Sequence, residues 1–482
     1  MSACAFRIES VELFERNVRL RLPFRFGVAT LTSCPQAFVR ARIAFADGRS
    51  MTGAAAELMV PKWFDKSPGK TAADNVDDLR DALAAAAGAY VASTATQTAF
   101  GHFATHYAAL VATGVRAGRN ALTSCFGPAV VDRAVLDALC RHAGVSFYAA
   151  LAGNLPGMDC RVTPDLADEE IANFLAQLTP RTHIAARHTV GLVDPITADD
   201  VEARVPDGLP QTLEEVIAAY GNRHFKVKVG GDPAADHARV ARIVAVLDRL
   251  PHPYVATLDG NEQYGDVESV VALWQALAAD PALGRFMASV SMIEQPLPRD
   301  IALARSIAPL AVLKPALIDE SDETLDAFPR AKALGYTGVS SKGCKGLYKS
   351  LLNGARAAQW NRGVAAPTYF LSAEDLTTQA GLAVQQDLML ANLLGVGHVE
   401  RNGHHYSDGF AGQGASAAEA HGFLAAHPGL YTETDGVVRL AIRDGMIDLR
   451  SLDRPGFAAG AEPLWASLSP LQRATAAASI EH

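Results

Sequence analysis

An eightfold alternation of strand-like and helix-like segments most constrains the fold of this chain. From about His183 onward, each short run of β-branched or apolar residues is followed by a helix-length amphipathic segment. This pattern is typical of parallel strands joined by crossover helices, and eight such units suit a closed (β/α)8 barrel. The predicted strands are His183–Val190, Phe225–Val229, Val255–Leu258, Ser291–Ile293, Ala316–Ile318, Gly338–Ser341, Val364–Pro367 and Gly397–Val399.

The main structural alternative is an open, doubly wound sheet, which shows the same alternation. Such folds often bind nucleotides through a GxGxxG or Walker-type glycine loop that follows a strand. No predicted strand of this sequence is followed by either loop. We therefore predict a barrel of the TIM type.

The first 150 or so residues have a different pattern. Gln36–Phe45 alternates apolar and polar residues and precedes Asp47-Gly48, a strong hairpin signal, so antiparallel sheet is expected there. Ala-rich segments at Asp74–Ala92 and Gly127–Ala152 are predicted to be helical, the second because its apolar residues recur at helical spacing. The N-terminal region is therefore predicted to be an α+β domain.

Beyond the eighth strand the pattern loosens into Gly/Ala-rich sequence and then a polar tail, with one further strand predicted at Gly436–Ile442. This segment is too short for a domain of its own. The predicted organisation is an α+β domain in residues 1–155, the barrel in residues 156–410, and a C-terminal segment in residues 411–482 that packs back on the first domain.

The composition excludes several classes of protein. A net charge of −9, a pI near 5.9 and the lack of a dense basic cluster argue against nucleic acid as a partner. Charged residues occur almost at once and no long apolar run follows, which predicts neither a signal peptide nor a membrane span, and hence a cytoplasmic location. The six cysteines have no CxxC spacing, so neither a zinc site nor a disulfide framework is indicated.

Polar residues stand at or just past the ends of five consecutive predicted strands. They are separated by about 23 to 35 residues, roughly one βα unit each. Because the C-terminal ends of barrel strands converge on one mouth, we expect these side chains to form one site. The residues are Lys226 with Lys228, Asp259, Glu294, Asp319 with Glu320, and Lys342.

Three carboxylates at one barrel mouth indicate a bound cation, because an uncompensated buried carboxylate is strongly disfavoured or has its pKa raised until it is neutral. Asp259, Glu294 and Asp319 offer only oxygen ligands, which favours Mg²⁺, with Mn²⁺ as the alternative, over zinc. When a proton leaves the carbon beside a carboxylate, a divalent cation and a nearby ammonium can stabilise the enolate that forms.

A lysine must then act as the base in this chemistry. A free lysine is protonated at neutral pH, but neighbouring cations lower its pKa. Lys228 is the better candidate, because Lys226 and the metal ion would both act on it. The expected substrate is a small carboxylic acid.

These residues stand in motifs that resemble those of the enolase superfamily, whose Lys or His base and Mg²⁺ are a standard example of the chemistry above. The resemblance extends over most of the chain, because residues 30–42 and 47–57 are similar to that family's capping domain. The motifs are Phe225-Lys-Val-Lys-Val-Gly, Thr257-Leu-Asp-Gly-Asn, Ile293-Glu-Gln-Pro, Ile318-Asp-Glu-Ser and Ser341-Lys-Gly-Cys-Lys-Gly.

The resemblance implies a modified, enolase-like barrel with an N-terminal capping domain, and it implies a homo-oligomer. It makes Asp259, Glu294 and Asp319 the metal ligands and Lys228 the base on one face of the substrate. Lys342 becomes the acid/base on the other face, and Lys226 would polarise the substrate carboxylate. Weaker candidates for substrate contacts are Glu320, which is also an alternative metal ligand, and Asn261, Glu400, His404 and Trp63.

Asp-Glu-Ser after the fifth strand and lysine after the sixth resemble the muconate-lactonizing and dipeptide-epimerase branch of the superfamily. The mandelate-racemase branch has histidine after the seventh strand, where this sequence reads Thr368-Tyr-Phe-Leu-Ser. The chain also departs from the family pattern by extra sequence near Thr94–Thr123, at Asp194–Pro210 and beyond Gly403.

Several alternatives remain at the level of the sequence. Each carboxylate taken singly could cap a helix or pair with a surface lysine, and Lys345 is interpreted as a solvated or structural lysine. Aromatic residues at 24–28 and 63–64 belong either to the core or to loops that close over a substrate. The predicted reaction is racemisation, epimerisation or cycloisomerisation, and the alternatives are an acid-sugar-type dehydratase and a non-catalytic barrel that keeps a metal site.

Overall fold

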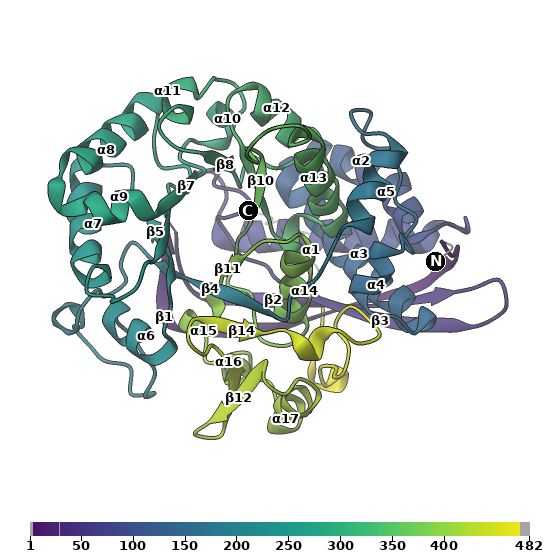
Figure 1. The fold of residues 1–482 in the computed structure, drawn as a ribbon. Coiled ribbons are helices and arrows are strands. Elements are labelled where there is room, and N and C mark those ends of the chain that lie inside the picture. Colours follow the sequence, from purple (N-terminus) through teal and green to yellow (C-terminus); the bar gives the residue numbers. More distant parts are fainter. Residues whose placement is uncertain (1–2, 28, 473–482) are drawn as a thin grey trace, which may run out of the picture.

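The structure is a computed structural model that describes residues 3–27 and 29–472. Within this part of the chain, eight parallel strands close into a barrel because β11 pairs with β4, which confirms the predicted fold (Figure 1). The barrel strands are β4 His183–Val190, β5 His224–Lys228, β6 Val255–Asp259, β7 Val290–Glu294, β8 Ala316–Ile318, β9 Gly338–Ser341, β10 Phe370–Ala373 and β11 His398–Glu400.

The seventh strand is the one that was misplaced. Residues 364–367 form no strand, and the chain enters β10 at Phe370, which pairs with Gly338 of β9. Pro367 cannot donate a ladder hydrogen bond, which disfavours this stretch as an interior barrel strand. The residues that follow the seventh strand are therefore Glu374 and Asp375, not residues 368–372. As predicted, no histidine stands at the end of this strand.

Helices fill the connections between the strands, as the 3.6-residue apolar period predicts. Three of them begin with a side-chain cap, namely Thr212 at α6, Asp232 at α7 and Asp266 at α8. The helices from the first domain's end through the barrel are α5 Asp168–Ala176, α6 Leu213–Tyr220, α7 Pro233–Leu247, α8 Val267–Ala279, α9 Gly284–Ser289, α10 Arg299–Ala302, α11 Ala308–Ala311, α12 Ala327–Ala333, α13 Leu347–Trp360 and α14 Leu382–Leu393.

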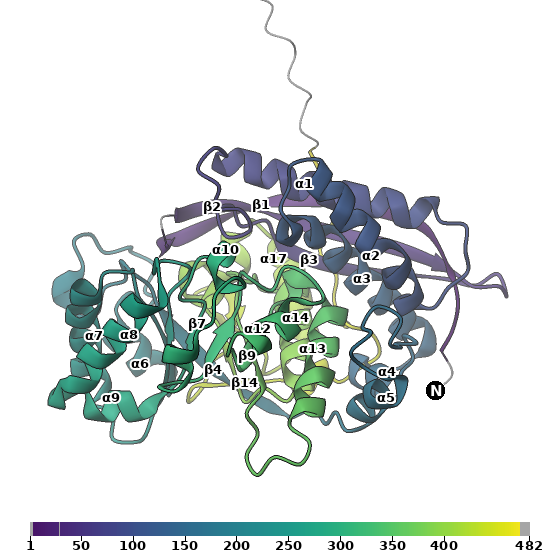
Figure 2. The same cartoon turned by 90° about the horizontal axis from the view of Figure 1, so that it is seen from above.

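The N-terminal domain is an antiparallel sheet covered on one side by helices (Figure 2). Gly53 of β3 lies against α3 so closely that a Cβ there would come within 2.2 Å of the Ala138 backbone nitrogen, so the contact requires glycine. The elements are β1 Arg7–Phe26, β2 Ala29–Ala44, β3 Ser50–Leu58, α1 Ala72–Ala92, α2 Ala99–Arg116, α3 Ala121–Ala143 and α4 Phe147–Ala152.

The C-terminal segment adds a strand to each of the two sheets. β14 pairs antiparallel with β4 of the barrel, and β15 pairs antiparallel with β1 of the first domain. A separate hairpin, β12–β13, contains the strand predicted at Gly436–Ile442. The elements are α15 Gly403–Tyr406, α16 Gly409–Gly412, α17 Ala417–Ala426, β12 Tyr431–Thr434, β13 Val437–Leu440, β14 Met446–Asp448 and β15 Ser469–Pro470.

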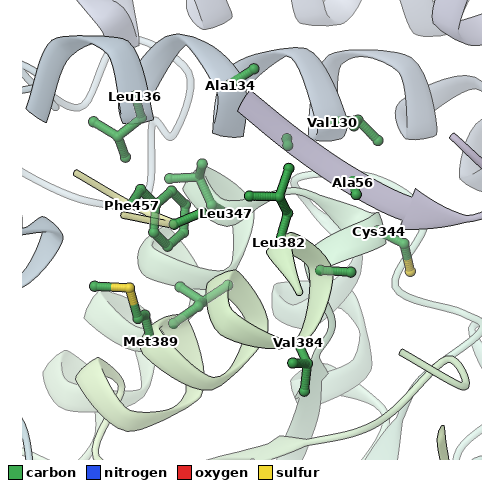
Figure 3. Packing of buried hydrophobic residues seen from close by; sticks show 14 of the residues in the cluster. Ala56, Val130, Ala134, Leu136, Cys344, Leu347, Leu382, Val384, Met389 and Phe457 are labelled. Carbon is green, nitrogen blue, oxygen red and sulfur yellow. The ribbon is translucent and has the colours of Figure 1, made fainter. Parts of the chain in front are cut away.

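The two domains share a continuous apolar core. Figure 3 shows side chains of β3 and α3, among them Ala56 and Val130, facing Leu382 and Met389 of α14 across the interface. Phe457 of the C-terminal segment stacks on Phe147 of α4, with ring centroids 3.9 Å apart. Burying apolar area at about 25 cal/mol per Å² makes such an interface hard to open, so the first domain is held firmly on the barrel. Among the described residues, no helix is both long and apolar enough to cross a membrane.

Candidate active site

The residues predicted from the strand ends do converge at one mouth of the barrel. Lys228, Asp259 and Glu294 are the last residues of β5, β6 and β7, and Asp319 and Lys342 come directly after β8 and β9. All five side chains are buried. In a closed barrel of eight strands, β5 and β9 lie four positions apart and therefore face each other across the mouth.

Lys226 lies two residues before Lys228 and thus one layer deeper in the barrel. In the described chain its Nζ is surrounded by carboxylate oxygens from β6, β7, β10 and β11 at 2.7–2.9 Å. Burial opposes its positive charge, but these carboxylates outweigh burial and hold the pKa of Lys226 well above its ordinary value. The four acidic residues are Asp259, Glu294, Glu374 and Glu400.

Glu294 is the least satisfied acid in this group. Burial and the neighbouring charges of Asp259 and Glu374 raise its pKa well above the ordinary value. In Asp259, by contrast, burial is outweighed by Lys226 and Lys228, so its pKa is lowered. In Asp319 burial is likewise outweighed, here by Lys342 and Lys345. The negative charge of the carboxylates at the mouth therefore exceeds the positive charge that its lysines supply.

Lys228 and Lys342 each contact one carboxylate of the predicted metal set. Lys228 Nζ lies 2.5 Å from Asp259 Oδ2, and Lys342 Nζ lies 2.6 Å from Asp319 Oδ2. The Lys342 ammonium also lies 4.3 Å from the centre of the Trp63 ring, a cation–π contact contributed by the N-terminal domain. Both lysines line a small cavity at the barrel mouth.

The remaining walls of this cavity are mainly apolar and aromatic. Phe24 and Phe26 come from the end of β1, and Val60 and Trp63 from the loop after β3, so the N-terminal domain forms the roof. Barrel loops contribute the rest. The position of Phe24, Phe26 and Trp63 fits the interpretation that the aromatic residues belong to loops that close over a substrate. Position 28 lies outside the described residues. The other lining residues are Asn261, Asp375, Leu376, Thr377 and Asn402.

Asp319 is held in place by a second lysine that the sequence interpretation left out. Lys345 is buried, not solvated, and its Nζ lies 3.3 Å from Asp319 Oδ1, 3.2 Å from the Asp319 carbonyl and 2.6 Å from Ser340 Oγ. Ser340 donates its own hydroxyl to Asp319. Gln295 accepts the Asp319 backbone N–H at 2.8 Å. The carboxylate is therefore fixed by several partners at once.

Glu320 and Asn261 contact the loop of the N-terminal domain. Lys66 Nζ, from that loop, lies 3.3 Å from Glu320 Oε1, 2.8 Å from the Asn261 carbonyl and 2.7 Å from Glu262 Oε2. Arg299 donates to the carbonyls of Trp63 and Phe64 and to Glu262. These contacts fasten the roof of the cavity to the barrel.

Of the two weaker candidates after β11, Glu400 lies in the site and His404 does not. Glu400 ends β11 and binds Lys226, with Thr189 donating to its other oxygen at 2.5 Å. Burial is outweighed by the lysines around it, so the pKa of Glu400 lies well below the ordinary value. His404 instead lines a separate cavity behind the β11–α15 connection. Glu374 belongs to the site and was missed, because the seventh strand was placed too early in the chain.

Backbone strain concentrates at the same strand ends. Asn261, Gln295 and Thr377 have φ values of 42°, 31° and 55°, in the left-handed region that costs non-glycine residues energy. All three are buried and follow strands β6, β7 and β10. Such strain persists where surrounding contacts enforce it, and it is common at functional sites.

The donor set suits a hard divalent cation. Asp259, Glu294 and Asp319 are fully buried carboxylates on adjacent strands, and Glu294 Oε2 has no hydrogen bond of ordinary geometry. In the described chain, no three His, Cys, Asp or Glu side chains already stand in a metal-binding arrangement, because the carboxylates contact lysines instead. A cation at this place would replace ammonium groups as the partner of these oxygens.

No family model matches the sequence, and no curated protein matches it. Solved structures do match over nearly the whole length of both chains. An enolase from Bradyrhizobium complexed with magnesium and mandelic acid is 15% identical, covers 97% of this chain and 98% of its own, and has a TM-score of 0.59.

Two further structures are similar in the same way. A dipeptide epimerase from Enterococcus faecalis, complexed with Mg and the dipeptide L-Leu-L-Tyr, is 14% identical with a TM-score of 0.58 and coverage of 94% and 99%. A muconate lactonizing enzyme from Pseudomonas fluorescens is 18% identical with a TM-score of 0.55 and coverage of 95% and 97%. The chain thus has the capped (β/α)8-barrel fold of the enolase superfamily.

Proposed function

We propose that this protein is a Mg²⁺-dependent isomerase that removes the α-proton of a carboxylic acid and returns a proton to the same carbon. The observation that carries the proposal is the placement of Lys228 and Lys342 on opposite sides of one cavity, each beside a carboxylate of the candidate metal set. Such a pair reaches both faces of a bound carbon acid. Racemisation, epimerisation and cycloisomerisation begin with the same proton removal.

Asp259, Glu294 and Asp319 would hold the Mg²⁺ ion, with Mn²⁺ as a substitute. When bound, the cation stabilises the negative charge that develops on the substrate carboxylate. The protein's own part is to hold the acid between the two lysines and to exclude water under the roof formed by Trp63 and its neighbours.

Proton transfer would proceed through the lysine nitrogens. A neutral Lys228 Nζ takes the α-proton, forming an N–H bond as the C–H bond breaks, and the Lys342 ammonium delivers its proton to the opposite face of the carbon. The roles reverse for the other enantiomer. Lys226 has its charge shared among four carboxylates and does not line the cavity in the described structure, so we assign it the positioning of those acids, not contact with the substrate.

Apolar and aromatic side chains form part of the cavity wall. Phe24, Phe26, Val60, Trp63 and Leu376 present apolar surface beside the two lysines. The favoured substrate is therefore a compact carboxylic acid with an apolar α-substituent.

Metal binding tests the foundation of this proposal. We expect calorimetric titration of EDTA-treated protein with Mg²⁺ to show one saturable site that Asp259→Ala removes. Asp132→Asn is the matched control, because Asp132 is equally buried but lies in α3 of the N-terminal domain. If the wild type bound Mg²⁺ neither alone nor with carboxylic acids present, the metal-dependent function would be rejected. Solvent deuterium exchange at the α-carbon, followed by NMR across a panel of acids, then identifies the substrate.

Lys345 gives a sharper prediction about the metal ligand it holds. Lys345→Met should weaken Mg²⁺ binding about tenfold, because Asp319 loses a partner that orients it. Lys349→Met is the control, since Lys349 is equally buried and contacts Asp322 but not Asp319. Its Mg²⁺ affinity should stay within about twofold of wild type. Tighter binding by Lys345→Met would instead mean that Lys345 competes with the metal for Asp319.

A further inference from the structure

A second cavity, separate from the lysine site, lies where the C-terminal segment meets the barrel. Its volume is about 140 Å³. The β10–α14 and β11–α15 connections form one side, and the β12–β13 hairpin with the residues after it forms another. In Figure 1 these C-terminal elements, in yellow-green, gather next to α15 and α16. Leu209 and Tyr220 close the cavity from the connection between β4 and β5.

Two stretches of sequence that depart from the family pattern contribute to this cavity. Leu209 belongs to the extra segment after β4, and Thr432, Leu440 and Ile442 belong to the extension beyond Gly403. Arg21 of β1 fastens the first of these stretches, with hydrogen bonds to the carbonyls of Pro210 and His405 and an ion pair to Asp207 at 2.5 Å. The extra sequence therefore forms a defined concave surface.

The walls combine apolar surface with hydrogen-bonding groups that have room for a ligand. Leu209, Val384, Leu440 and Ile442 supply the apolar part. Within the described chain the hydroxyls of Tyr220, Thr378 and Thr432 make no hydrogen bond. The His404 ring has no hydrogen-bond partner there other than the backbone of Arg401. Burial, aided by the Arg401 charge, lowers the pKa of His404 to about 3, so the ring is neutral at pH 7.

The charges around the cavity favour an anion with one negative charge. Of the described residues that line it, none is acidic. Arg401 is paired with Asp375 and Asp387, and Arg439 with Asp408. Arg443 has no ion pair within the described chain. One arginine beside an otherwise neutral, largely apolar cavity suits a single carboxylate attached to an apolar body.

We propose that this cavity is a second binding site, for a small monocarboxylic acid with an apolar body. The carboxylate meets Arg443 at the rim, the body lies against Leu209, Leu440 and Ile442, and Tyr220 and His404 offer hydrogen bonds within. The site stands independently of the proposed isomerase activity, because it uses none of the lysine or carboxylate residues of the barrel mouth.

One carboxylate connects the floor of this cavity to the lysine site. Asp375 accepts the backbone N–H groups of Thr378 at 2.8 Å, Asn402 at 2.7 Å and Gly403 at 3.1 Å. Thr378 and Gly403 line the second cavity, whereas Asp375 and Asn402 line the first. A ligand that orders this floor would therefore also order one wall of the candidate active site.

The test is a titration with 4-fluorophenylacetate followed by ¹⁹F NMR, with neutral 4-fluorophenylacetamide as the comparison probe. We expect saturable binding of the acid that persists in Lys342→Met, a variant that alters the lysine site. Leu209→Trp fills the second cavity from a loop, where the fold tolerates change, and should raise Kd at least about tenfold. Arg443→Gln should raise Kd about three- to fivefold.

Arg450→Gln is the matched control for Arg443, because Arg450 is a similarly exposed arginine nearby in sequence that pairs with Asp448 and does not line the cavity. Its Kd should equal that of the wild type. The proposal is overturned if binding disappears in Lys342→Met but survives in Leu209→Trp, which would place the acid in the lysine site. It is also overturned if neither probe binds saturably, whatever the fate of the isomerase proposal.

Discussion

Replacing Lys228 or Lys342 by methionine is expected to reduce interconversion of the two enantiomers of the substrate by about 10³-fold, the usual scale for losing a positioned acid or base. Each lysine reaches one face of the carbon, so each is needed once per turnover. The two variants should differ in which enantiomer still exchanges its α-proton. Lys228→Met should retain solvent deuterium exchange for the enantiomer whose α-hydrogen faces Lys342, and Lys342→Met should retain it for the other.

NMR of each enantiomer in D₂O, with every protein saturated with Mg²⁺, measures this difference. Lys349→Met serves as the control, because it removes a buried lysine near β9 that does not line the cavity. Loss of exchange for the same enantiomer in both variants would contradict the two-base mechanism and favour a single-base route. Full activity in both would reject the lysines as acid and base. Calorimetry with Mg²⁺ separates either result from loss of the metal.

The positions of the predicted metal ligands and bases could be read from the sequence because each depends on local order. A barrel strand must end where its apolar run ends, and the next residue enters the mouth. Asp259, Glu294, Asp319 and Lys342 all follow this rule within one residue. Local pattern therefore fixes which side chains reach the mouth.

Their environments could not be predicted, because these depend on strands far apart in the chain. Lys226 was expected to contact the substrate, yet Glu374 and Glu400, 148 and 174 residues further on, complete a ring of acids around it. Lys345 was interpreted as solvated or structural, and the packing of η3 Gly343–Lys345 under α3 and α14 buries it. Burial of a lysine follows from tertiary packing that no local pattern records.

The seventh strand was misplaced for a related reason. Residues 364–367 and Phe370–Ala373 are both short and partly apolar, and hydrophobic pattern alone does not distinguish two such runs. The register is set by pairing with β9, where Phe370 lies opposite Gly338 and fills the space that a side chain there would need. Glu374 was missed because of this shift of a few residues.

Replacing Lys226 by methionine is expected to lower the free energy of unfolding by about 3–5 kcal/mol at pH 7, the range measured when one partner of a buried ion pair is removed. Asp259, Glu294, Glu374 and Glu400 would then lose the cation they share at 2.7–2.9 Å. Lys70→Met is the control. Lys70 also pairs with two acids, Asp65 and Asp78, but its side chain is 25% exposed, so the loss should stay near 1 kcal/mol or less.

The effect of pH on the Lys226→Met protein distinguishes lost charge balance from lost packing. In the wild type, burial and neighbouring acids already raise the pKa of Glu294. Without Lys226, the other carboxyls lose the attraction that keeps their pKa values low, so these pKa values should rise as well. A carboxyl whose pKa is raised by folding destabilises the protein as pH increases through that range. The stability difference from wild type, measured by urea unfolding in EDTA, should therefore be smaller at pH 5.5 than at pH 8.

Saturating Mg²⁺ at pH 8 should restore part of the loss, because a divalent cation supplies the missing positive charge. A deficit that changes with neither pH nor Mg²⁺ would show that Lys226 acts through packing, and that the carboxylates around it do not form a metal site.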